Sequence, residues 1–374
     1  MPLPTSPVSF ACLECVADPR WDRNKRHKLV DILVIALCGF LAGCEGWVDV
    51  ARFGRAKRRW LEQFLELPNG VPSHDTFGRV FALLDPQQLA RVLRQFVQAL
   101  VPSLAGEAVA VDGKTLAGSG QKTTGKQALH LVSAWATRHG VVLGQVATAD
   151  HSNEIMAIPP LLRLMDLRGA TVTIDAMGCQ KEIARQVREQ GADYVLAVKG
   201  NQQHLAEAVD LQMRRTHAKL ARSKWQTCEK DHGRRDERTY TAMEAPAPVR
   251  REWPDARSVV RVCRVTTDGQ GKKTKEVRDF VSSAPAEAER LAVAIRGHWG
   301  IENRLHWSLD VTFREDDSRI RVGHGPENAA LLRRLALSIV KQDTRYSDSL
   351  RGKRLRAGWE TGVLEHFLMI FAGH

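Results

Sequence analysis

The sequence contains no long apolar run and no recognisable export signal. Its most apolar stretch, Ile32–Gly43, is about a dozen residues long, whereas a helix that crosses a membrane needs roughly 20. We therefore expect a buried helix there. The first ten residues, MPLPTSPVSF, lack the charged start and apolar core of a signal peptide. Together these absences favour a cytoplasmic protein.

Cysteine is sparse and irregularly spaced. The chain has seven cysteines in 374 residues, an odd number without the spacing of a disulfide framework, which favours a reducing compartment. Cys12 and Cys15 form a CxxC pair, a spacing found in zinc sites. Cys38 and Cys44 fall in or beside the apolar stretch, where cysteine commonly serves as a small hydrophobe. Whether Cys12 and Cys15 bind a metal stays open.

Positive charge is what the chain has in excess. Its net charge is +12 and its pI about 9.6, which favours a polyanionic partner. Clustered Lys and Arg with aromatic neighbours are typical of nucleic-acid binding, although a solvated helix face is the better interpretation of any one cluster alone. The clusters are RNKRHK at 23–28, RAKRR at 55–59 and RGKRLR at 351–356, and Trp21, Phe53, Trp60 and Trp359 lie near them.

Apolar residues at helical spacing predict an all-helical domain over residues 1–104. Ser73 is the expected cap of one helix, and Asp85-Pro86 begins the next. These two helices could form a helix-turn-helix that places Ser73–Arg79 on DNA. Helix packing without DNA contact is an equally good interpretation. The other helices expected here are Lys25–Leu41 and Trp47–Leu65.

From residue 105 short β-branched runs alternate with helical ones. The expected order is three strands, a helix, a strand, a helix and a strand, which predicts an α/β fold with helices on the faces of a mixed sheet. Arg138-His139-Gly140 is the expected hairpin turn. Ribonuclease-H-like nucleases share this order. The expected strands are Glu107–Asp112, Ala128–Thr137, Val141–Ala149, Ala170–Asp175 and Asp193–Val198, and the helices are Pro159–Leu167 and Gln180–Gln190.

Residues 201–285 are basic and too long for a connection, so we expect an inserted, β-rich subdomain. A helix should run to about Lys224, and a long helix over Ala286–Leu309 follows the insertion. A chain of this length is expected to form two or three domains; we divide it into 1–104, 105–200, 201–285 and 286–374. The strand-like runs of the insertion are Arg238–Met243, Val259–Val265 and Val277–Ser283.

Three acidic residues suggest a metal-dependent site. Asp112 and Asp175 each close a strand-like run, and Glu302 lies in the last long helix. Two Mg²⁺ ions about 3.5–4 Å apart are held by carboxylates where phosphodiesters are cut or joined. Any one of these acids alone is as readily explained as a solvated or capping residue.

Six blocks of the sequence carry a resemblance to a known family. The chain resembles the DDE transposases of bacterial insertion sequences, in the H-repeat-associated family, over nearly its whole length. The last block is long and idiosyncratic and is the strongest of them. The blocks are DGK at 112–114, HSNEI at 151–155, DAMGCQ at 175–180, YVLAVKGNQ at 194–202, HGRRDER at 232–238 and HWGIENRLHWSLDVTFREDDSRIR at 298–321.

The resemblance implies a catalytic triad of Asp112, Asp175 and Glu302 in a ribonuclease-H-like core. Asp112 would bridge two Mg²⁺ or Mn²⁺ ions. The implied chemistry is metal-dependent attack of water on a phosphodiester at the transposon end, followed by attack of the freed 3′-hydroxyl on target DNA. The implied partners are the terminal inverted repeats, target DNA and a second copy of the chain in a synaptic dimer, with the protein at the nucleoid when DNA is bound.

Residues near the acids are candidates for contacts with DNA. Helical spacing places His298, Trp299, Leu305 and His306 near Glu302. We expect His298 and Asn303 to touch the scissile phosphate or a metal-bound water, and Trp299 or Trp307 to pack or stack at a transposon end, with a core position the better interpretation of Trp307. The expected phosphate contacts are Lys114, Lys199, Arg319 and Arg321.

The chain departs from related transposases at positions around the glutamate. Those enzymes carry a tyrosine and an arginine upstream and a lysine seven residues after it, where this chain has Ile295, His298 and Leu309. Arg296 and Arg304 are possible substitutes, and a hairpin intermediate is left in doubt. Two alternatives stay open: a transposon-derived DNA-binding protein that no longer cuts, and a stand-alone nuclease on the same fold.

Overall fold

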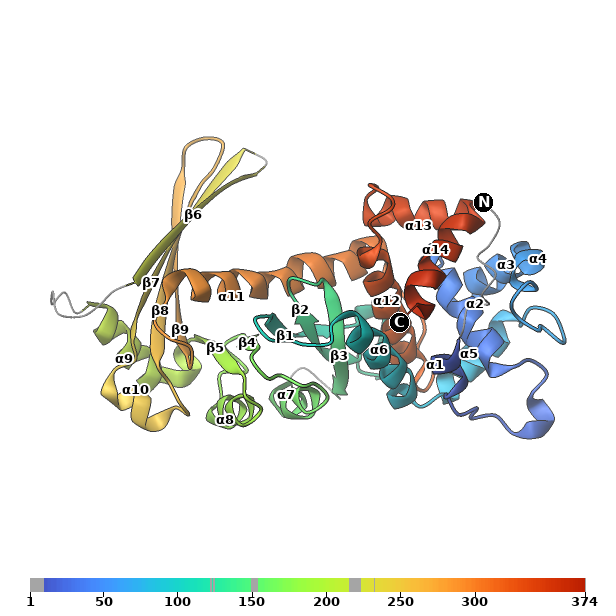
Figure 1. Cartoon of the computed structure of the whole chain (residues 1–374), viewed down its shortest axis with the longest axis horizontal. Helices are drawn as coiled ribbons and strands as arrows, with labels where there is room; N and C mark the ends of the chain where they lie inside the picture. Colours follow the sequence, from blue (N-terminus) through green and yellow to red (C-terminus); the bar gives the residue numbers. More distant parts are fainter. Residues whose placement is uncertain are drawn as a thin grey trace.

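A single nine-stranded sheet runs through the middle of the molecule. The structure, a computed structural model, describes residues 10–121, 123, 125–148, 154–214, 223–231 and 233–373. The strand order is β3-β2-β1-β4-β5-β9-β8-β7-β6, and helices from both ends of the chain lie together at one end of the molecule (Figure 1). The strands are β1 Ala108–Thr115, β2 His130–Ala136, β3 Val141–Thr148, β4 Thr171–Ile174, β5 Asp193–Val198, β6 Ser223–Asp231, β7 Arg234–Glu244, β8 Ser258–Thr267 and β9 Lys273–Ser282.

The first five strands form the mixed half of this sheet. β1 is antiparallel to β2 and parallel to β4, and β4 is parallel to β5. Helices α7 (Glu154–Leu162) and α8 (Lys181–Glu189) cover one face, and α11 (Ala288–Gly300) crosses the other (Figure 1). The predicted order of elements and the mixed sheet are therefore confirmed, as is the hairpin at 138–140, where Gly140 has φ 69°.

Two boundaries in this half were predicted wrongly. β1 continues through Asp112 to Thr115, so this aspartate lies within the strand rather than at its end. α7 begins at Glu154 and contains Pro159 and Pro160, whereas a proline was expected to open the helix. The apolar side chains of Ile158 and its neighbours pack into the main core, and this packing stabilises the helix despite the missing N–H groups. Residues 151–153 of the HSNEI block lie outside the described residues.

The insertion extends the same sheet rather than forming a separate one. β9 pairs antiparallel with β5, and β8, β7 and β6 follow in order. The helix expected to reach Lys224 ends earlier: α9 is Gln203–Arg214, and Ser223–Asp231 is strand β6. That edge strand is largely exposed, so it has no apolar alternation to reveal it, and pairing with β7 defines it. A short helix, α10 (Ala247–Glu252), was also not predicted.

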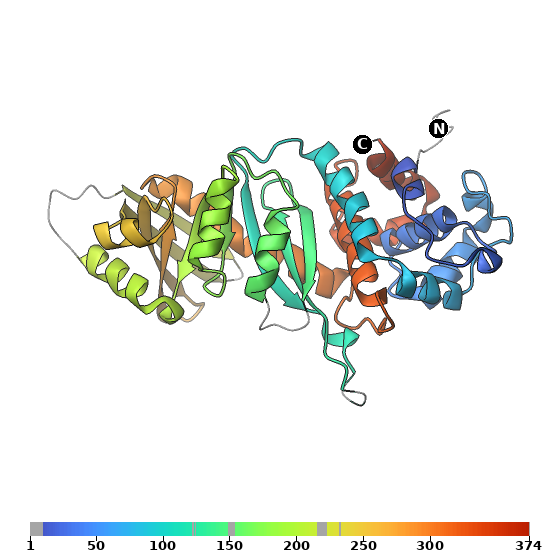
Figure 2. The same ribbon diagram turned by 90° about the horizontal axis from the view of Figure 1, so that it is seen from below.

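The helical end combines residues from both termini. α12 packs against α2, α5 and α6, and α13 and α14 also contact α2, so that early and late parts of the chain lie side by side (Figures 1 and 2). The expected Ser73 and Asp85 caps are confirmed, with N–H groups of Thr76 and Gln87 donating to them. The helices are α1 Ala11–Glu14, α2 Leu29–Leu41, α3 Trp47–Ala56, α4 Arg58–Leu61, α5 His74–Leu83, α6 Pro86–Leu100, α12 Gly325–Gln342, α13 Leu350–Trp359 and α14 Thr361–Ala372.

Two predicted N-terminal helices are shorter than expected. The first begins at Leu29 instead of Lys25, and the second breaks near Lys57 into α3 and α4. The apolar stretch is buried over residues 32–41 in α2, as predicted, while residues 42 and 43 lie past the helix end and are partly exposed. Within the described ranges, no helix is both long enough and apolar enough to span a bilayer.

The predicted long helix over Ala286–Leu309 is not α-helical throughout. α11 ends at Gly300, and the chain continues as two π-helical segments, Ile301–His306 and Ser308–Thr312. In a π-helix each backbone bond spans five residues rather than four, and such segments are rare and frequent at functional sites. The α-helical spacing used to place neighbours of Glu302 therefore does not apply beyond Gly300.

Candidate active site

Parallel pairing of β1 with β4 brings Asp112 and Asp175 level with each other. The last registered pair of these strands is Val111 with Ile174, and the two aspartates are the next residue of each chain segment. Alternation along the strands places them on the face that bears Ala108 and Thr173. Ala108 packs against α11, and Thr173 hydrogen-bonds His298. Both carboxylates therefore face α11.

Glu302 completes a cavity lined by all three acids. The cavity has a volume of about 430 Å³, and its walls come from β1, β4, β5, β9 and α11. Asp175 accepts hydrogen bonds from the N–H groups of Met177 and Gly178, 3.0 and 3.2 Å away, which fixes its side chain at the start of the loop. The structure thus gathers residues that are far apart in sequence, as predicted.

The three carboxylates lack directly paired cations in the described part of the chain. Within the described residues, none of them forms an ion pair with Lys or Arg; the one paired group is His306, whose Nδ1 lies 3.5 Å from Asp112 Oδ2. Burial raises the pKa of Asp112 to about 7; the Gly113 N–H opposes this shift, and the carboxylates of Glu154, Asp175 and Glu302 add to it. The three acids are therefore not ion-paired with a lysine or arginine among the described residues, although Lys199 and Arg278 line the same cavity.

This donor set fits Mg²⁺ or Mn²⁺. Both are hard cations that bind carboxylate oxygens, and Mg²⁺ is usually held by one or two carboxylates together with substrate phosphates. In the described part of the chain no three His, Cys, Asp or Glu side chains converge into a ready-made metal cage. Cys12 and Cys15 are free thiols in the structure.

A buried pair beneath Asp112 was not predicted. His130 Nε2 lies 3.3 Å from Glu154 Oε2, and the other ring nitrogen lies 2.9 Å from the hydroxyl of Thr115. A Cβ at Gly113 would approach His130 Nε2 to 2.5 Å and Glu154 to 2.6 Å. A larger side chain at position 113 would clash with His130 and Glu154, which explains the glycine of the DGK block. Glu154 belongs to the HSNEI block, which is the sequence signal that could have identified it.

Two histidines near the acids are neutral at pH 7. Burial lowers the pKa of His298 to about 4 and that of His306 to about 3. His298 lines the cavity, and its Nδ1 lies 3.0 Å from Thr173 Oγ1. His306 contacts Asp112 through Nδ1, and its buried Nε2 has no hydrogen-bond partner among the described residues. Neither imidazole supplies a positive charge to the site.

Trp299 lies at the centre of an arginine cluster. The guanidinium groups of four arginines lie 5.0–5.9 Å from the centroid of its ring, a cation–π arrangement. Three of them belong to the insertion, so this cluster joins the insertion to α11 just before Glu302. The arginines are Arg238, Arg264, Arg278 and Arg296. Of these, Arg278 alone also lines the cavity.

Acidic partners occupy all four arginines; Arg278 pairs with Glu276 at 2.7 Å and Arg238 with Glu229 at 3.0 Å. Arg296 binds Glu229 through two bonds of 3.0 and 2.9 Å, and Arg264 binds Asp236 at 3.1 and 2.7 Å. Arg296 is therefore engaged in this contact between the insertion and α11. Arg304, the other proposed substitute, is exposed.

The expected DNA-contact residues fall in different places. Lys199 is exposed and lines the cavity, and Asn303 is exposed and donates to the carbonyl of Trp299. Arg319 lines a separate groove beside Arg79 of α5. Lys114 and Arg321 instead bind partners within the protein: Lys114 contacts three carboxylates, and Arg321 Nε donates to Gly118 O at 2.9 Å.

Two corrections concern aromatic residues. Trp307 was expected in the core, but 58% of its surface is exposed. It follows the π-helical segment that carries Glu302, and the π-helical register turns it outward. Phe53 and Trp60 are buried, whereas Trp21 and Trp359 are exposed beside their basic clusters.

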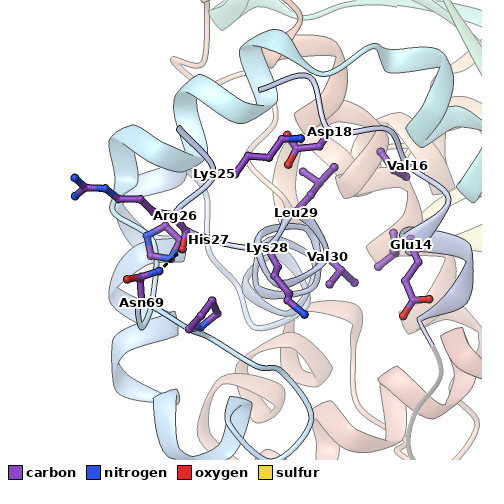
Figure 3. Close-up of a pocket in the computed structure, with 12 residues that line it drawn as sticks. Glu14, Val16, Asp18, Lys25, Arg26, His27, Lys28, Leu29, Val30 and Asn69 are labelled. Atoms are coloured by element: carbon purple, nitrogen blue, oxygen red, sulfur yellow. Dashed lines mark hydrogen bonds between the residues drawn. The ribbon is translucent and has the colours of Figure 1, made fainter. Parts of the chain in front are cut away.

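The basic cluster at 23–28 borders a pocket of about 560 Å³ with both charged and apolar lining residues (Figure 3). Lys25 pairs with Asp22, and Lys28 pairs with Glu66. Arg26 points away from the pocket in Figure 3. Because acidic partners offset the two lysines, this cluster has less free positive charge than its sequence indicates.

Comparison with known proteins gives the family. The family model described as the transposase DDE domain matches residues 104–339, and the model described as DDE_Tnp_1-associated matches residues 10–97. The chain therefore belongs to the DDE transposases. Within them it falls in the H-repeat family, as its relatives indicate.

The relatives match over most of their length. The chain is 36% identical over 363 residues to the H repeat-associated putative transposase YhhI of Escherichia coli (strain K12), covering 95% of this chain and 96% of that protein. It is 35% identical to the putative transposase YncI of Escherichia coli O157:H7, covering 95% and 93%. A solved piggyBac transposase synaptic complex with hairpin DNA matches with a TM-score of 0.41 at 11% identity, over 94% of this chain and 73% of that chain, a likeness too distant to carry an argument.

Proposed function

We propose that this transposase cleaves DNA at the ends of its element and joins the freed ends to target DNA, with Asp112, Asp175 and Glu302 as the catalytic carboxylates. The observation that supports this is their placement. Two aspartates lie level on parallel strands, a glutamate shares their cavity, and no lysine or arginine among the described residues neutralises them. We further propose that residues 105–200 and 286–374 form a ribonuclease-H-like core. Residues 1–104 form a helical domain, and residues 201–285 form an insertion.

The proposed reaction exchanges one phosphodiester for another. Water adds to the phosphorus at the transposon end, and the 3′-oxygen leaves as a hydroxyl; that hydroxyl then attacks a phosphodiester of target DNA and displaces its 3′-oxygen. Bound Mg²⁺ or Mn²⁺ ions, two per site, would lower the pKa of the attacking group and stabilise charge on the phosphate. The three carboxylates would hold these ions.

Residues at the cavity can position the DNA. The exposed Lys199 lines the cavity and supplies positive charge for backbone phosphates. Arg278 lines it too, but its charge is offset by Glu276 at 2.7 Å. His298, being neutral and buried, can offer only a hydrogen bond through its imidazole. Asn303, Trp307 and Arg304 form an exposed strip beside Glu302 that suits contact with a DNA end. We propose that two copies of the chain bring two such ends together.

The test is cleavage of DNA that carries the flanks of the gene, mapped at nucleotide resolution with Mg²⁺ or Mn²⁺. The control is Asp112→Asn, which preserves shape and removes charge. Metal-dependent cuts at both inverted ends, absent in the variant, would support a transposase that uses these acids. DNA binding with no cleavage under any condition would instead indicate a transposon-derived DNA-binding protein that no longer cuts. Cleavage at sites unrelated to the element's ends would indicate a general nuclease.

A further inference from the structure

Lys114, the lysine of the DGK block, lies in a closed group of charges rather than at the DNA surface. Its Nζ lies 2.6 Å from Asp310, 2.9 Å from Asp316 and 3.6 Å from Glu315, and its side chain is 9% exposed. Glu315 also binds Arg334 of α12 at 2.8 Å, with both side chains fully buried. The five residues form what we call the Lys114 cluster.

The Lys114 cluster joins the two elements that carry the acids. Lys114 follows Asp112 by two positions, so both side chains leave the same face of β1. Asp310 belongs to the second π-helical segment, which continues directly from the segment that holds Glu302. One ammonium group therefore fixes the end of β1 to the end of the π-helix.

The turn after the π-helix is shaped to close this cluster. Arg314 has φ 49°, in the left-handed region that residues other than glycine rarely adopt. It reverses the chain so that the next two residues, Glu315 and Asp316, point back to Lys114. A Cβ on Gly118 would overlap the carbonyl oxygens of Asp316 and Ser318, so the turn rests directly on the connection after β1.

A π-helix depends on its surroundings because its hydrogen-bond geometry is less favourable than that of an α-helix. At the N-terminal end of the π-helix, the arginine cluster holds Trp299. At the other, Lys114 holds Asp310, and Arg354 donates to the carbonyl of Thr312. Loss of either attachment would let the segment change register and move the carboxylate of Glu302.

We infer that Lys114 is a positioning residue: through Asp310 and the turn at 315–316 it sets where Glu302 stands relative to Asp112. The inference rests on the proposed function, because it explains how that site is held in shape. A surface lysine would bind phosphate; this one holds together the two walls of the site. The positive charge of Lys114 forms ion pairs within the protein instead of binding DNA phosphates.

The first test is hydrogen exchange on the whole protein without DNA or metal, comparing Lys114→Met with the wild type. Amides of residues 301–316 should exchange faster in the variant, while β6–β9 keep their rates. Lys181→Met is the matched control, because Lys181 pairs with Glu252 at an exposed site. Unchanged exchange at 301–316 in Lys114→Met would overturn the inference.

The second test separates positioning from DNA contact. Cleavage by Lys114→Met should fall on the order of 100-fold, as for a catalytic group displaced by about 1 Å, and half-maximal cleavage should need more Mg²⁺. DNA affinity without metal should stay within about twofold, with the same salt dependence, whereas loss of a phosphate contact would reduce the salt slope by about 1. Weakened binding with a lower slope and normal exchange would refute the inference.

A third variant covers the case in which Lys114→Met does not fold. Asp310→Asn leaves Lys114 with Glu315 and Asp316 and removes only the link to the π-helix. It should reproduce the faster exchange at 301–316, and the double variant should lose less activity than the sum of the two single variants. Additive losses would overturn the inference. If the wild type fails to cleave, the proposed function fails, while the exchange and binding results still decide the role of Lys114.

Discussion

At the scale of single residues, glycine decides how closely two segments can approach. Gly118 lies against the backbone of the turn at 316–318, where there is no room for a methyl group. Gly118→Ala should therefore lower the free energy of unfolding by about 1–3 kcal/mol, as for overpacked sites. Gly200→Ala, at a position with nothing within 4 Å of the new Cβ, is the control in chemical denaturation. Equal stability of the two variants would show that the close approach at Gly118 does not matter to the fold.

Trp307 provides a second test at this scale. Because more than half of its surface is exposed, Trp307→Ala should change the free energy of unfolding by no more than about 0.5 kcal/mol. Trp135→Ala, which removes a fully buried ring, should cost about 3–5 kcal/mol. Loss of a base-stacking contact would weaken DNA binding by Trp307→Ala by about 1–3 kcal/mol. If Trp307→Ala instead lowered the free energy of unfolding by several kcal/mol, Trp307 would have to be a core residue.

At the scale of elements, α12 carries a half-buried lysine against the sheet. Burial lowers the pKa of Lys341 to about 8, and its Nζ lies 4.9 Å from the ring centroid of Trp135. The unfolded chain holds this proton up to a higher pH than the folded one. The destabilisation is therefore complete below pH 8 and disappears as the pH rises towards the ordinary lysine value near 10.5.

Lys341→Met should accordingly stabilise the protein at pH 7, by on the order of 1–3 kcal/mol. The gain should shrink between pH 8 and 10.5, because the wild type loses its penalty across that window. Unfolding in denaturant at a series of pH values measures the difference between the two proteins. A gain that does not depend on pH would show that the variant acts through packing alone.

Elements with a clear pattern of residue types could be predicted from the sequence, whereas elements that depend on contacts with distant segments could not. The β1–β5 order, the Ser73 and Asp85 caps and the three acids followed from periodicity, capping chemistry and motif resemblance. Strand β6 has no buried side to mark it, and the π-helix at 301–312 has the composition of an ordinary helix. Its register is set by contacts with the arginine cluster and with Lys114, which no local pattern contains.

The same distinction explains which site residues were missed. The function of a lysine beside a catalytic aspartate is ambiguous in sequence, because phosphate binding and internal ion pairing use the same group. Only the fold shows that Lys114 meets Asp310 in the π-helix and Asp316 after the turn at Arg314. Glu154 and His130 likewise meet only after α7 has packed on the sheet.

At the scale of the whole molecule, the net charge of +12 predicts DNA binding dominated by phosphates. The logarithm of the binding constant should fall linearly with the logarithm of salt concentration, with a slope of about −0.9 for each phosphate neutralised. Asp112→Asn should keep this slope, because the carboxylates proposed as catalytic would not contact DNA without metal. Fluorescence anisotropy over roughly 50 to 300 mM salt measures it, and a flat dependence would exclude the expected binding mode.

The interleaving of the two chain ends at the helical end has a consequence for synthesis and for decay of the gene. The apolar helix α2 emerges early from the ribosome, yet its partner α12 begins only at residue 325. Helices α1 and α3 cover part of α2 early, but the surface that α12 covers stays unburied until then, which makes the nascent chain slow to mature and prone to aggregate. A copy of the gene truncated before that point would therefore encode an insoluble fragment rather than a competing, partly active protein.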